Sequence, residues 1–321
     1  MPRSSMPDNA PDPASSQPRV LFVGGAMKSG STLLGALLGQ FPGLFNVGEL
    51  ARYWVEVASG RGRCGCGLSL DACDFWAGVT ADCQARGVEL ARMSERVYEL
   101  DETRRLGRVL TRRFRSEVRA KWAELAAATQ ILYSSAWRRS GARYLVDVSK
   151  LPTHLLLLRE PGSVDLFLLH LVRDGRAVAY SWERTRRKRT GSPKTGSVRG
   201  HRWAGSDVLV WALQNFMIER LGRDLAGRTL LRYEDLAESP RAALLRALET
   251  LGIAPGEGGV DERAPRLEPT HSIAGSPQVR FAESGTAIVP DDAWRRELGT
   301  ARRRAWTLLA WPALRRYGYK T

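Results

Sequence analysis

The sequence predicts an α/β domain in which a central, mostly parallel sheet is flanked by helices. Two observations lead to this prediction. Short apolar, β-branched segments alternate along the chain with longer segments whose apolar residues recur at helical spacing, as expected for a parallel sheet with both faces covered. In addition, the first apolar segment runs through a glycine-rich turn directly into a helical segment, which is how many three-layer α/β domains begin.

Composition and charge narrow the class of protein. The chain has 321 residues, 43% hydrophobic and 26% charged, which excludes fully disordered, collagen-like and disulfide-dense proteins. Residues 1–18 are rich in Pro, Ser, Ala and Asp and predict a disordered tail, so residues 19–321 are expected to form the folded domain. The tail lacks the apolar core of a signal peptide, and no stretch approaches about 18 apolar residues, so a cytoplasmic location is expected.

The formal net charge of +15 favours an anionic partner, which could be a nucleic acid, an acidic membrane surface or a polyanionic small ligand. Composition alone does not choose among these three, so the choice rests on the motifs and their positions along the chain.

The predicted elements follow in order along the chain. Residues 19–25 predict a buried strand, the helix after it ends at Pro42, and residues 44–47 predict a second strand followed by a helix. Residues 61–140 contain all four cysteines and then basic helical segments, and predict a mostly helical insertion. Further strands are predicted at 144–149, 165–172 and 229–236, and further helices at 173–189, 206–222 (amphipathic), 240–253 and 294–319. Residues 183–204 are expected to form a mobile lid, and residues 254–292 are loop-rich.

The turn after the first strand, GGAMKSGSTLL (24–34), predicts an anion site. Backbone N–H groups at the start of a helix, together with its dipole, favour a bound phosphate, and Gly30 allows close approach of the backbone. The side chains available to the anion are Lys28, Ser29, Ser31 and Thr32. The order differs from G-x-x-x-x-G-K-[ST] because Gly30 is followed by Ser31, so the usual metal-holding pair is missing. A plain tight turn is the alternative.

This loop resembles the 5′-phosphosulfate loop of sulfotransferases that use 3′-phosphoadenosine 5′-phosphosulfate (PAPS). Four later segments are similar to family segments in the same order: LVRDGRAVAYSW (171–182), LLRYEDL (230–236), HSIAGSPQVRF (271–281) and the tail that ends in RYGY. The resemblance spans about residues 19–321. It implies a P-loop NTPase-like, three-layer fold and a PAPS-dependent sulfotransferase of the bacterial type.

Arg173 follows a predicted strand, and Ser181 lies eight residues later on a predicted helix. Ligands of parallel α/β sheets bind at the carboxyl ends of the strands, so Arg173 is well placed to bind phosphate. The resemblance implies that Arg173, Ser181 and Arg280 contact the 3′-phosphate and that Tyr233 lies near the nucleotide. The alternatives are a surface arginine that caps a strand and a half-buried strand tyrosine. Arg176 is either a further phosphate ligand or a solvated charge.

Sulfuryl transfer resembles loose phosphoryl transfer, so the protein must stabilise the leaving charge and deprotonate the acceptor. Lys28 suits the first role. For the second, Glu49 in NVGEL resembles a glutamate that follows a glycine in some family members and acts as the base. Other members have a Lys-Thr-His pattern, whereas here Lys150 lies four residues before His154. His154 is therefore the alternative base, and a third possibility is that neither Glu49 nor His154 is the base. Lys150 resembles a second family lysine near the transferred group, or else pairs with Asp147 or another acid.

Cysteines 64, 66, 73 and 83 form the pattern C-x-C-x₆-C-x₉-C. Structural zinc sites normally contain C-x₂₋₄-C pairs, so the spacing fits zinc poorly, and disulfides are disfavoured in the cytosol. Packed or redox-labile thiols are favoured, while a disulfide and a metal site stay open. The RCGCG…CDFW segment resembles one that is common in bacterial sulfotransferases. The resemblance also places a histidine where His271 stands, although His271 is expected to be structural.

The predicted function is transfer of a sulfuryl group from PAPS to a hydroxyl or amine acceptor, with adenosine 3′,5′-bisphosphate as the other product. No catalytic metal is expected, because lysine and arginine already neutralise the phosphates. One alternative is a P-loop small-molecule kinase, although the Gly-Lys-Ser/Thr order is absent. The other is a basic nucleic-acid-binding module, supported by the net charge and by the arginine-rich segment 104–121. The sequence has no recognition motif, so a nucleic-acid partner is not expected.

Overall fold

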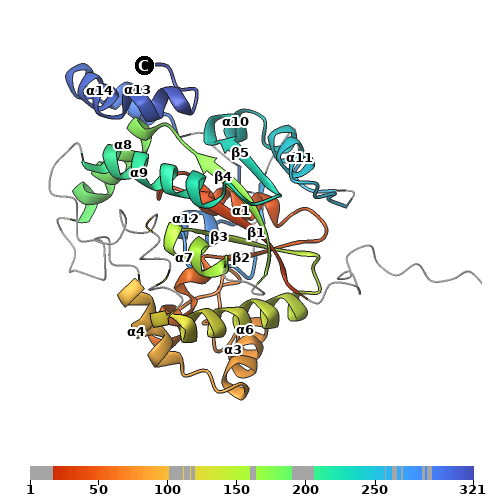
Figure 1. Ribbon diagram of the computed structural model, residues 1–321. Helices are drawn as coiled ribbons and strands as arrows, with labels where there is room; N and C mark the ends of the chain where they lie inside the picture. The colour runs from red at the N-terminus through yellow and green to blue at the C-terminus, as the bar shows by residue number, and fades with distance from the viewer. Residues whose placement is uncertain are drawn as a thin grey trace, which may run out of the picture.

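The computed structural model describes residues 17–100, 111, 116, 120–159, 164–189, 206–256, 258–261, 266–268, 270–283, 286–287 and 291–321. A five-stranded parallel sheet with strand order β2-β3-β1-β4-β5 lies at its centre (Figure 1). The strands are β1 (Arg19–Gly25), β2 (Leu44–Gly48), β3 (Tyr144–Lys150), β4 (Asp165–Val172) and β5 (Arg228–Arg232). The α/β class and the parallel sheet predicted from the sequence are confirmed.

Alternation along β1 divides the core into two layers. Leu21 and Val23 face α1 (Ser31–Leu38) and α11 (Pro240–Thr250), while Val20 and Phe22 face the layer that contains α7 (Pro152–Leu158) and α9 (Ser206–Leu221). All four side chains are fully buried. Because successive side chains of a strand point to opposite faces, a strand covered on both sides has the continuous apolar sequence seen in residues 20–23.

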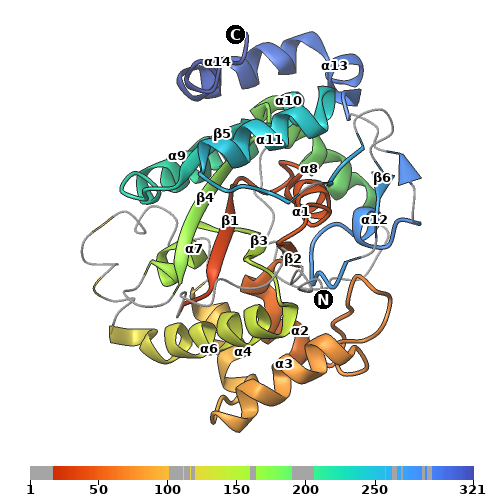
Figure 2. The ribbon, with the colours of Figure 1, turned by 90° about the vertical axis from the view of Figure 1, so that its right-hand side faces the viewer.

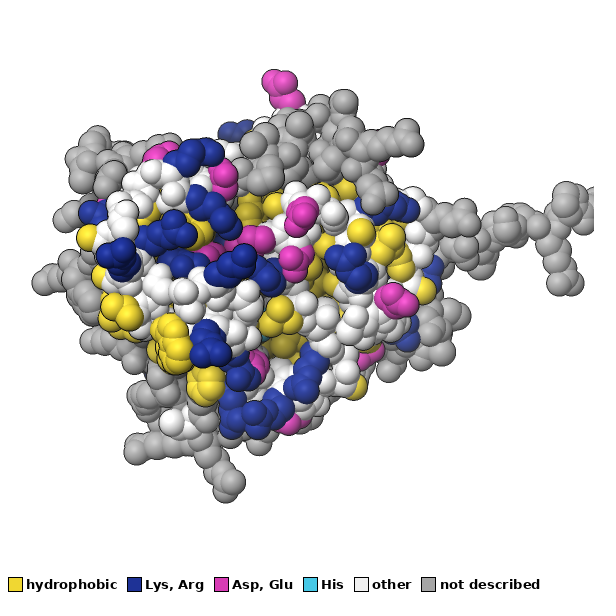
Figure 3. Space-filling view, turned by 90° about the horizontal axis from the view of Figure 1, so that it is seen from above, with side chains coloured by type: hydrophobic (Ala, Val, Ile, Leu, Met, Phe, Trp, Pro, Cys, Tyr) yellow, Lys and Arg dark blue, Asp and Glu magenta, His cyan; other side chains and the backbone are white. Residues whose placement is uncertain are grey.

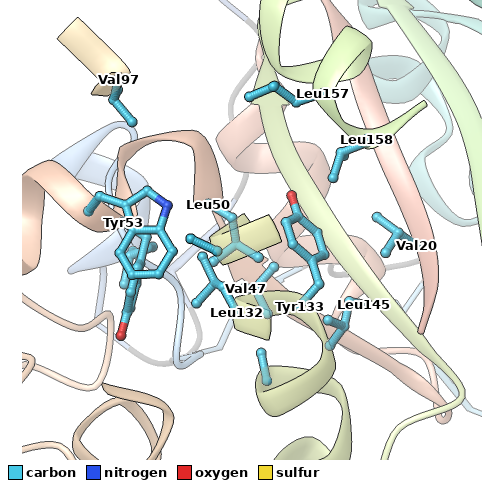
Figure 4. Close-up of a cluster of buried hydrophobic side chains, with 14 of the residues drawn as sticks. Val20, Val47, Leu50, Tyr53, Val97, Leu132, Tyr133, Leu145, Leu157 and Leu158 are labelled. Carbon is cyan, nitrogen blue, oxygen red and sulfur yellow. The ribbon is translucent and has the colours of Figure 1, made fainter. Parts of the chain in front are cut away.

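Residues between β2 and β3 form an additional, mostly helical layer at the bottom of Figure 1. After a short 3₁₀ turn (Leu50–Arg52), it comprises α2 (Tyr53–Ala58), α3 (Asp74–Ala85), α4 (Leu90–Leu100) and α6 (Ala123–Ser140). Its core is continuous with one face of the sheet: Figure 4 shows Leu132 and Tyr133 of α6 beside Val20 and Leu145 of the strands. Arginines 104, 105, 108, 112, 113, 115 and 119 lie outside the described residues.

The chain after β4 supplies the remaining elements, and among them α13 (Ala293–Glu297) and α14 (Thr300–Arg316) lie at the end of the molecule opposite the helical layer (Figure 2). The others are α8 (Gly175–Arg189), α10 (Tyr233–Glu238), α12 (Pro277–Arg280) and a small hairpin of β6 (Arg266–Leu267) and β7 (Thr286–Ala287). Arg176 forms a buried ion pair with Asp174, with 2.7 Å between Nη2 and Oδ2, and donates to the carbonyl of Lys320. Arg176 is therefore a structural residue that anchors the C-terminus, and neither of its expected roles is correct.

Several predicted elements differ from the structure, and the helix expected at 294–319 is interrupted between α13 and α14. The strand expected at 229–236 ends at Arg232, and Tyr233 begins the helix α10; the carboxylates of Glu234 and Asp235 favour this helix start through its dipole. Helix α9 has no single apolar face, because it buries Trp211 and Ile218 while Leu209, Leu213 and Phe216 are exposed. Residues 183–189 of the expected lid continue α8, whereas residues 190–204 and the expected tail at 1–16 lie outside the described residues.

Among the described residues, no helix combines the length and the apolar composition that a membrane span requires. The end of the molecule that carries α13 and α14 presents Lys and Arg side chains mixed with hydrophobic ones (Figure 3). On α14 these include exposed Leu308, Leu309 and Trp311 together with Arg302, Arg303 and Arg304. Part of the positive charge of the chain is thus spread over a solvated helix.

Candidate functional site

All five strands contribute a side chain to one cleft of about 1030 Å³. Each residue lies at or just beyond the carboxyl end of its strand, from β1 to β5: Lys28, Glu49, Lys150, Arg173 and Tyr233. Parallel strands end at the same edge of a sheet, so residues that are far apart in the sequence meet there. Ser181 of α8 and Arg280 of α12 also line this cleft.

The loop between β1 and α1 forms the floor of the cleft. Its backbone adopts positive φ at Lys28 (68°) and at Gly30 (94°). Gly30, Ser31 and Thr32 line the cleft, while the Ser29 hydroxyl is buried and has no hydrogen-bond partner among the described residues. The hydroxyls that do line the cleft, those of Ser31 and Thr32, stand at the start of a helix and are suited to an anionic ligand, because they and the free backbone N–H groups there can donate to phosphate or sulfate.

Backbone strain is concentrated at the cleft. Within the described residues, the non-glycine residues with positive φ are Lys28, Lys150 and Ala274, and all three line the cleft. The left-handed region costs a residue with a Cβ atom about 1–2 kcal/mol, and it persists only where surrounding structure enforces it. The backbones of Lys28 and Lys150 are therefore held in a conformation of higher energy than that of an ordinary loop residue.

Glu49 and Lys150 form an ion pair inside the cleft, with 2.6 Å between Oε1 and Nζ. The Lys150 ammonium also donates to the carbonyl of Val148 at 3.0 Å, and the backbone N–H of Glu49 donates to the carbonyl of Ile273 at 2.8 Å. Of the two partners considered for Lys150, the structure selects the second, because the acid is Glu49 and not Asp147. The pair fixes one carboxylate and one ammonium next to the β1–α1 loop.

Arg173 lies at the opposite side of the cleft and is almost fully buried. Its guanidinium lies 4.5 Å from the centre of the Tyr233 ring and donates to the carbonyl of Lys28 at 3.3 Å. Asp291 contacts it through both its backbone carbonyl, at 2.7 Å, and its carboxylate, at 3.2 Å. The same carboxylate lies 3.6 Å from Arg184. Asp291 thus occupies two arginines that could bind an anionic ligand.

Residues 270–281 cover the β1–α1 loop from above. The backbone N–H of Ser276 donates to the Thr32 hydroxyl at 3.1 Å, and that of Ile273 donates to the carbonyl of Val47 at 3.0 Å. Arg280 donates to the carbonyls of Ser272, at 2.9 Å, and of Arg63. Burial lowers the pKa of Arg280, although a guanidinium stays charged near neutral pH.

His154, the alternative catalytic base, is not brought to the cleft. Its Nε2 lies 2.8 Å from the Tyr133 hydroxyl and 3.4 Å from Oδ2 of Asp147, in a buried network joining α6, β3 and α7. Tyr133 and Ser149 also donate to Asp147. Burial alone would raise the pKa of Asp147, but the hydrogen bonds from His154, Ser149 and Tyr133 outweigh it and hold this pKa below its usual value. The sequence already argued against His154 as the base, because the spacing between Lys150 and His154 departs from the Lys-Thr-His pattern.

Sequence analysis missed several residues that line the cleft, namely Arg52, Glu56, Arg184, Thr185 and Asp291. Six basic and three acidic side chains meet there, so the cleft is positive overall. Each acid faces a base, since Glu56 lies 3.7 Å from Arg52, Glu49 pairs with Lys150 and Asp291 pairs with Arg173. Two sequence signals were available: Arg52 and Glu56 are four residues apart at the start of α2, and the helical pattern of α8 continues through Arg184.

A cleft at the carboxyl edge of a parallel sheet, with a surplus of basic side chains and a helix start at its floor, is suited to a polyanionic ligand. Comparison with known families identifies the class of the protein: the model of the sulfotransferase family matches residues 18–255. The chain belongs to the sulfotransferase family, and the resemblance seen in the sequence is confirmed. Membership supports an enzyme that transfers a sulfuryl group from a donor to an acceptor.

Three solved structures of sulfotransferases or sulfotransferase domains are similar to this chain. The sulfotransferase domain from the Synechococcus PCC 7002 olefin synthase superposes with a TM-score of 0.50 at 20% identity, covering 97% of this chain and 99% of that one. The sulfotransferase domain from the curacin biosynthetic pathway gives 0.48 at 16% identity, over 95% and 99% of the two chains. A sulfotransferase from Alicyclobacillus acidocaldarius gives 0.43 at 15% identity, over 94% and 95%. No curated protein matches the sequence. The likeness to the olefin synthase domain agrees with the α/β fold described above.

Proposed function

We propose that this protein transfers the sulfuryl group of PAPS to a hydroxyl or amine acceptor, with Glu49 as the general base. The observation that carries the proposal is the convergence of Lys28, Lys150 and Arg173 on one cleft whose floor is the β1–α1 loop at the start of α1. PAPS carries about four negative charges near neutral pH. A cleft with a surplus of basic side chains and a helix start suits such a ligand.

The donor would be held at two ends of the cleft. The β1–α1 loop, from Lys28 to Thr32, would bind the 5′-phosphosulfate through its backbone N–H groups and hydroxyls. Arg173, Ser181 and Arg280 would bind the 3′-phosphate, because a planar guanidinium can donate two parallel hydrogen bonds to phosphate oxygens. Binding there requires that Asp291 release Arg173, since the two groups are already paired. Tyr233, packed beneath Arg173, would keep its guanidinium in place.

Catalysis in this proposal needs two charges of opposite sign near the transferred group. Lys28 would neutralise the negative charge that develops on the leaving phosphate oxygen. Such electrostatic stabilisation usually supplies most of the rate enhancement in transfer reactions with loose transition states. Glu49 would accept the proton of the acceptor's hydroxyl or amine. Lys150, which fixes the Glu49 carboxylate at 2.6 Å, would orient it and add a second positive charge beside the sulfuryl group.

A kinase is the second candidate and shares the fold. Such an enzyme normally holds Mg²⁺ with the Ser or Thr after its lysine and an acidic side chain. Among the described residues that line the cleft, the carboxylates are Glu49, Glu56 and Asp291, and each is engaged by a lysine or arginine. This pairing favours a donor whose charge is neutralised by basic side chains.

Calorimetric titration with adenosine 3′,5′-bisphosphate, without metal and beside ATP with Mg²⁺, tests the donor. We expect tight binding of the bisphosphate, lost in Lys28→Ala and Arg173→Ala and retained in the control Arg246→Ala, whose side chain is exposed on α11. Binding of ATP with Mg²⁺ alone would favour the kinase, and binding of neither ligand would contradict both.

Transfer from radiolabelled PAPS to a panel of hydroxyl and amine compounds then tests the base. With an active acceptor, Glu49→Gln should lower kcat by roughly 10²–10⁴-fold, which is the usual contribution of a general base. The same variant should keep the affinity for the bisphosphate. A variant with unchanged kcat would exclude Glu49 as the base.

A further inference from the structure

Three cysteines that are close in the sequence meet a histidine about 200 residues further along the chain, beside the cleft. Cys64, Cys66 and Cys73 belong to the segment between α2 and α3, and His271 belongs to the loop over the cleft. The four ligand atoms, three Sγ and one histidine nitrogen, all lie within 4.8 Å of one another. None of the three thiols is in a disulfide. We propose that these four residues form a structural zinc site.

The distances agree with a tetrahedral metal. Nδ1 of His271 lies 3.5 Å from Sγ of Cys64 and 3.3 Å from Sγ of Cys73. Zinc binds thiolate at about 2.3 Å and imidazole at about 2.0–2.1 Å, so tetrahedral angles separate a sulfur ligand from a nitrogen ligand by about 3.6 Å. Side chains that merely pack have no reason to direct four donor atoms to one point.

The backbone around Cys64 and Cys66 also suits a bound metal. The N–H of Cys66 points to Sγ of Cys64 at 3.5 Å, and the N–H of Gly67 donates to the carbonyl of Cys64 at 3.0 Å. This tight turn directs both thiols to one side of the chain. Gly67 adopts a φ of 92°, which only glycine takes without strain. An N–H group directed at sulfur stabilises a thiolate, as outer contacts do in metal sites.

The imidazole of His271 is held in place by its neighbours. Its ring lies against those of Phe75 and Phe45, with centroids 5.6 Å and 6.3 Å away and planes inclined by 27° and 13°. The carbonyl of His271 accepts a hydrogen bond from the indole of Trp76 at 2.7 Å. These contacts orient Nδ1 toward the sulfur atoms, and such fixing of a ligand ring is typical of built metal sites.

The chemistry of the ligand set selects zinc. Three sulfurs and one imidazole in tetrahedral arrangement are a common structural zinc set, whereas carboxylate-rich sites prefer harder cations. Zinc would displace three thiol protons to the solvent, so the filled site carries a net charge of −1. Four protein ligands leave no open position, so the metal would be structural and would not take part in transfer.

The test uses the full-length protein, purified under reducing conditions from zinc-supplemented medium. Mass spectrometry of the metal content should give about one zinc per chain, as expected for a closed four-ligand site. Cys66→Ser, at the exposed member of the set, and His271→Ala should lose the zinc. Cys83→Ala is the matched control, because Cys83 is a buried thiol outside the cluster and its removal should leave the zinc content unchanged.

Cobalt and hydrogen exchange supply readouts that do not depend on the variants. After removal of zinc, Co²⁺ added to the wild-type protein should produce the thiolate-to-cobalt and d–d bands of a tetrahedral site. Amide exchange in residues 270–281 should become faster on zinc removal. The proposal is overturned if wild-type protein retains no zinc and gives no cobalt spectrum, if a disulfide joins these cysteines in the reduced preparation, or if Cys66→Ser binds zinc as wild type does.

Discussion

Replacing Gly30 by alanine measures how tightly the phosphate loop is packed. A Cβ atom at this position would lie 2.6 Å and 2.8 Å from two carbons of the Tyr233 ring. The backbone φ of 94° adds the cost of the left-handed region, about 1–2 kcal/mol for alanine. Because the Tyr233 ring is buried beneath Arg173, relief of the overlap requires a shift of a packed group, at about 1–3 kcal/mol.

Gly87→Ala is the matched control. Gly87 has a φ of 78°, close to that of Gly30, but a Cβ atom there would meet no atom within 4 Å. Backbone strain and the change in unfolded-state entropy are therefore shared by the two variants. Urea unfolding should give a loss of about 1–2 kcal/mol for Gly87→Ala and about 2–5 kcal/mol for Gly30→Ala.

Affinity for adenosine 3′,5′-bisphosphate should separate the same two variants. The shift of the Tyr233 ring would displace Arg173, whose guanidinium lies 4.5 Å from it, so Gly30→Ala should weaken binding and Gly87→Ala should not. If Gly30→Ala is no less stable than Gly87→Ala, within about 0.5 kcal/mol, the overlap with Tyr233 carries no energy and the description of the loop as tightly packed is wrong.

Three further outcomes are expected. Asp291→Asn should tighten bisphosphate binding about fivefold in titration calorimetry, because it removes two ion pairs, to Arg173 and Arg184, through a carboxylate that is itself partly exposed, together worth roughly 1 kcal/mol; unchanged or weaker binding would show that Asp291 does not compete with the ligand for these arginines. Burial lowers the pKa of His170 to about 4. The unfolded state therefore takes up a proton as pH decreases below about 6.5 while the folded state does not, so stability should decrease by about 2 kcal/mol between pH 7 and pH 5 and less in His170→Gln; an equal decrease in both would remove His170 as the cause. Tyr133→Phe should lower stability by about 1–3 kcal/mol, by removing a buried donor, without changing bisphosphate affinity; a large loss of affinity would tie this network to the cleft.

The parts of the site that could be predicted from the sequence are local. The strand, turn and helix around Lys28 lie within about twenty consecutive residues, and Ser181 follows Arg173 by eight residues. In such segments, hydrophobic periodicity and glycine position determine which element forms and where the loop lies. The lengths of β1 and β4 were predicted correctly for this reason.

Contacts between distant segments could not be predicted in the same way. Asp291 meets Arg173, and His271 meets Cys73, because tertiary packing brings loops together. The spacing of the cysteines argued against zinc because the rule for zinc sites considers C-x₂₋₄-C pairs that are close in the sequence. In the structure, a fourth candidate donor, His271, comes from a distant loop. Tyr233 was assigned to a strand because the apolar pair Leu230 and Leu231 precedes it, whereas the acidic residues after it favour a helix start.

The loop above the cleft and the cysteine-containing segment are joined by backbone hydrogen bonds as well as by the side-chain cluster. The N–H of Gly65 donates to the carbonyl of Ser272 at 2.8 Å, and Cys64 bridges Ile273 in the manner of paired strands. There is no room for a side chain at Gly65, because its Cβ would lie 2.4 Å from the carbonyl oxygen of Thr270.

This pairing sets a rule for exchanging parts between related enzymes. A chimera that receives only residues 61–140 from a relative would place a foreign turn at residues 64–67 against the native loop 270–281. A poor fit between the two would shift this loop and disturb its hydrogen bond from Ser276 to Thr32 in the β1–α1 loop. If residues 61–140 and residues 270–281 are grafted together, both of the paired segments come from the same protein. The modular unit of this enzyme is therefore discontinuous in sequence, and recombination libraries should place their crossover points accordingly.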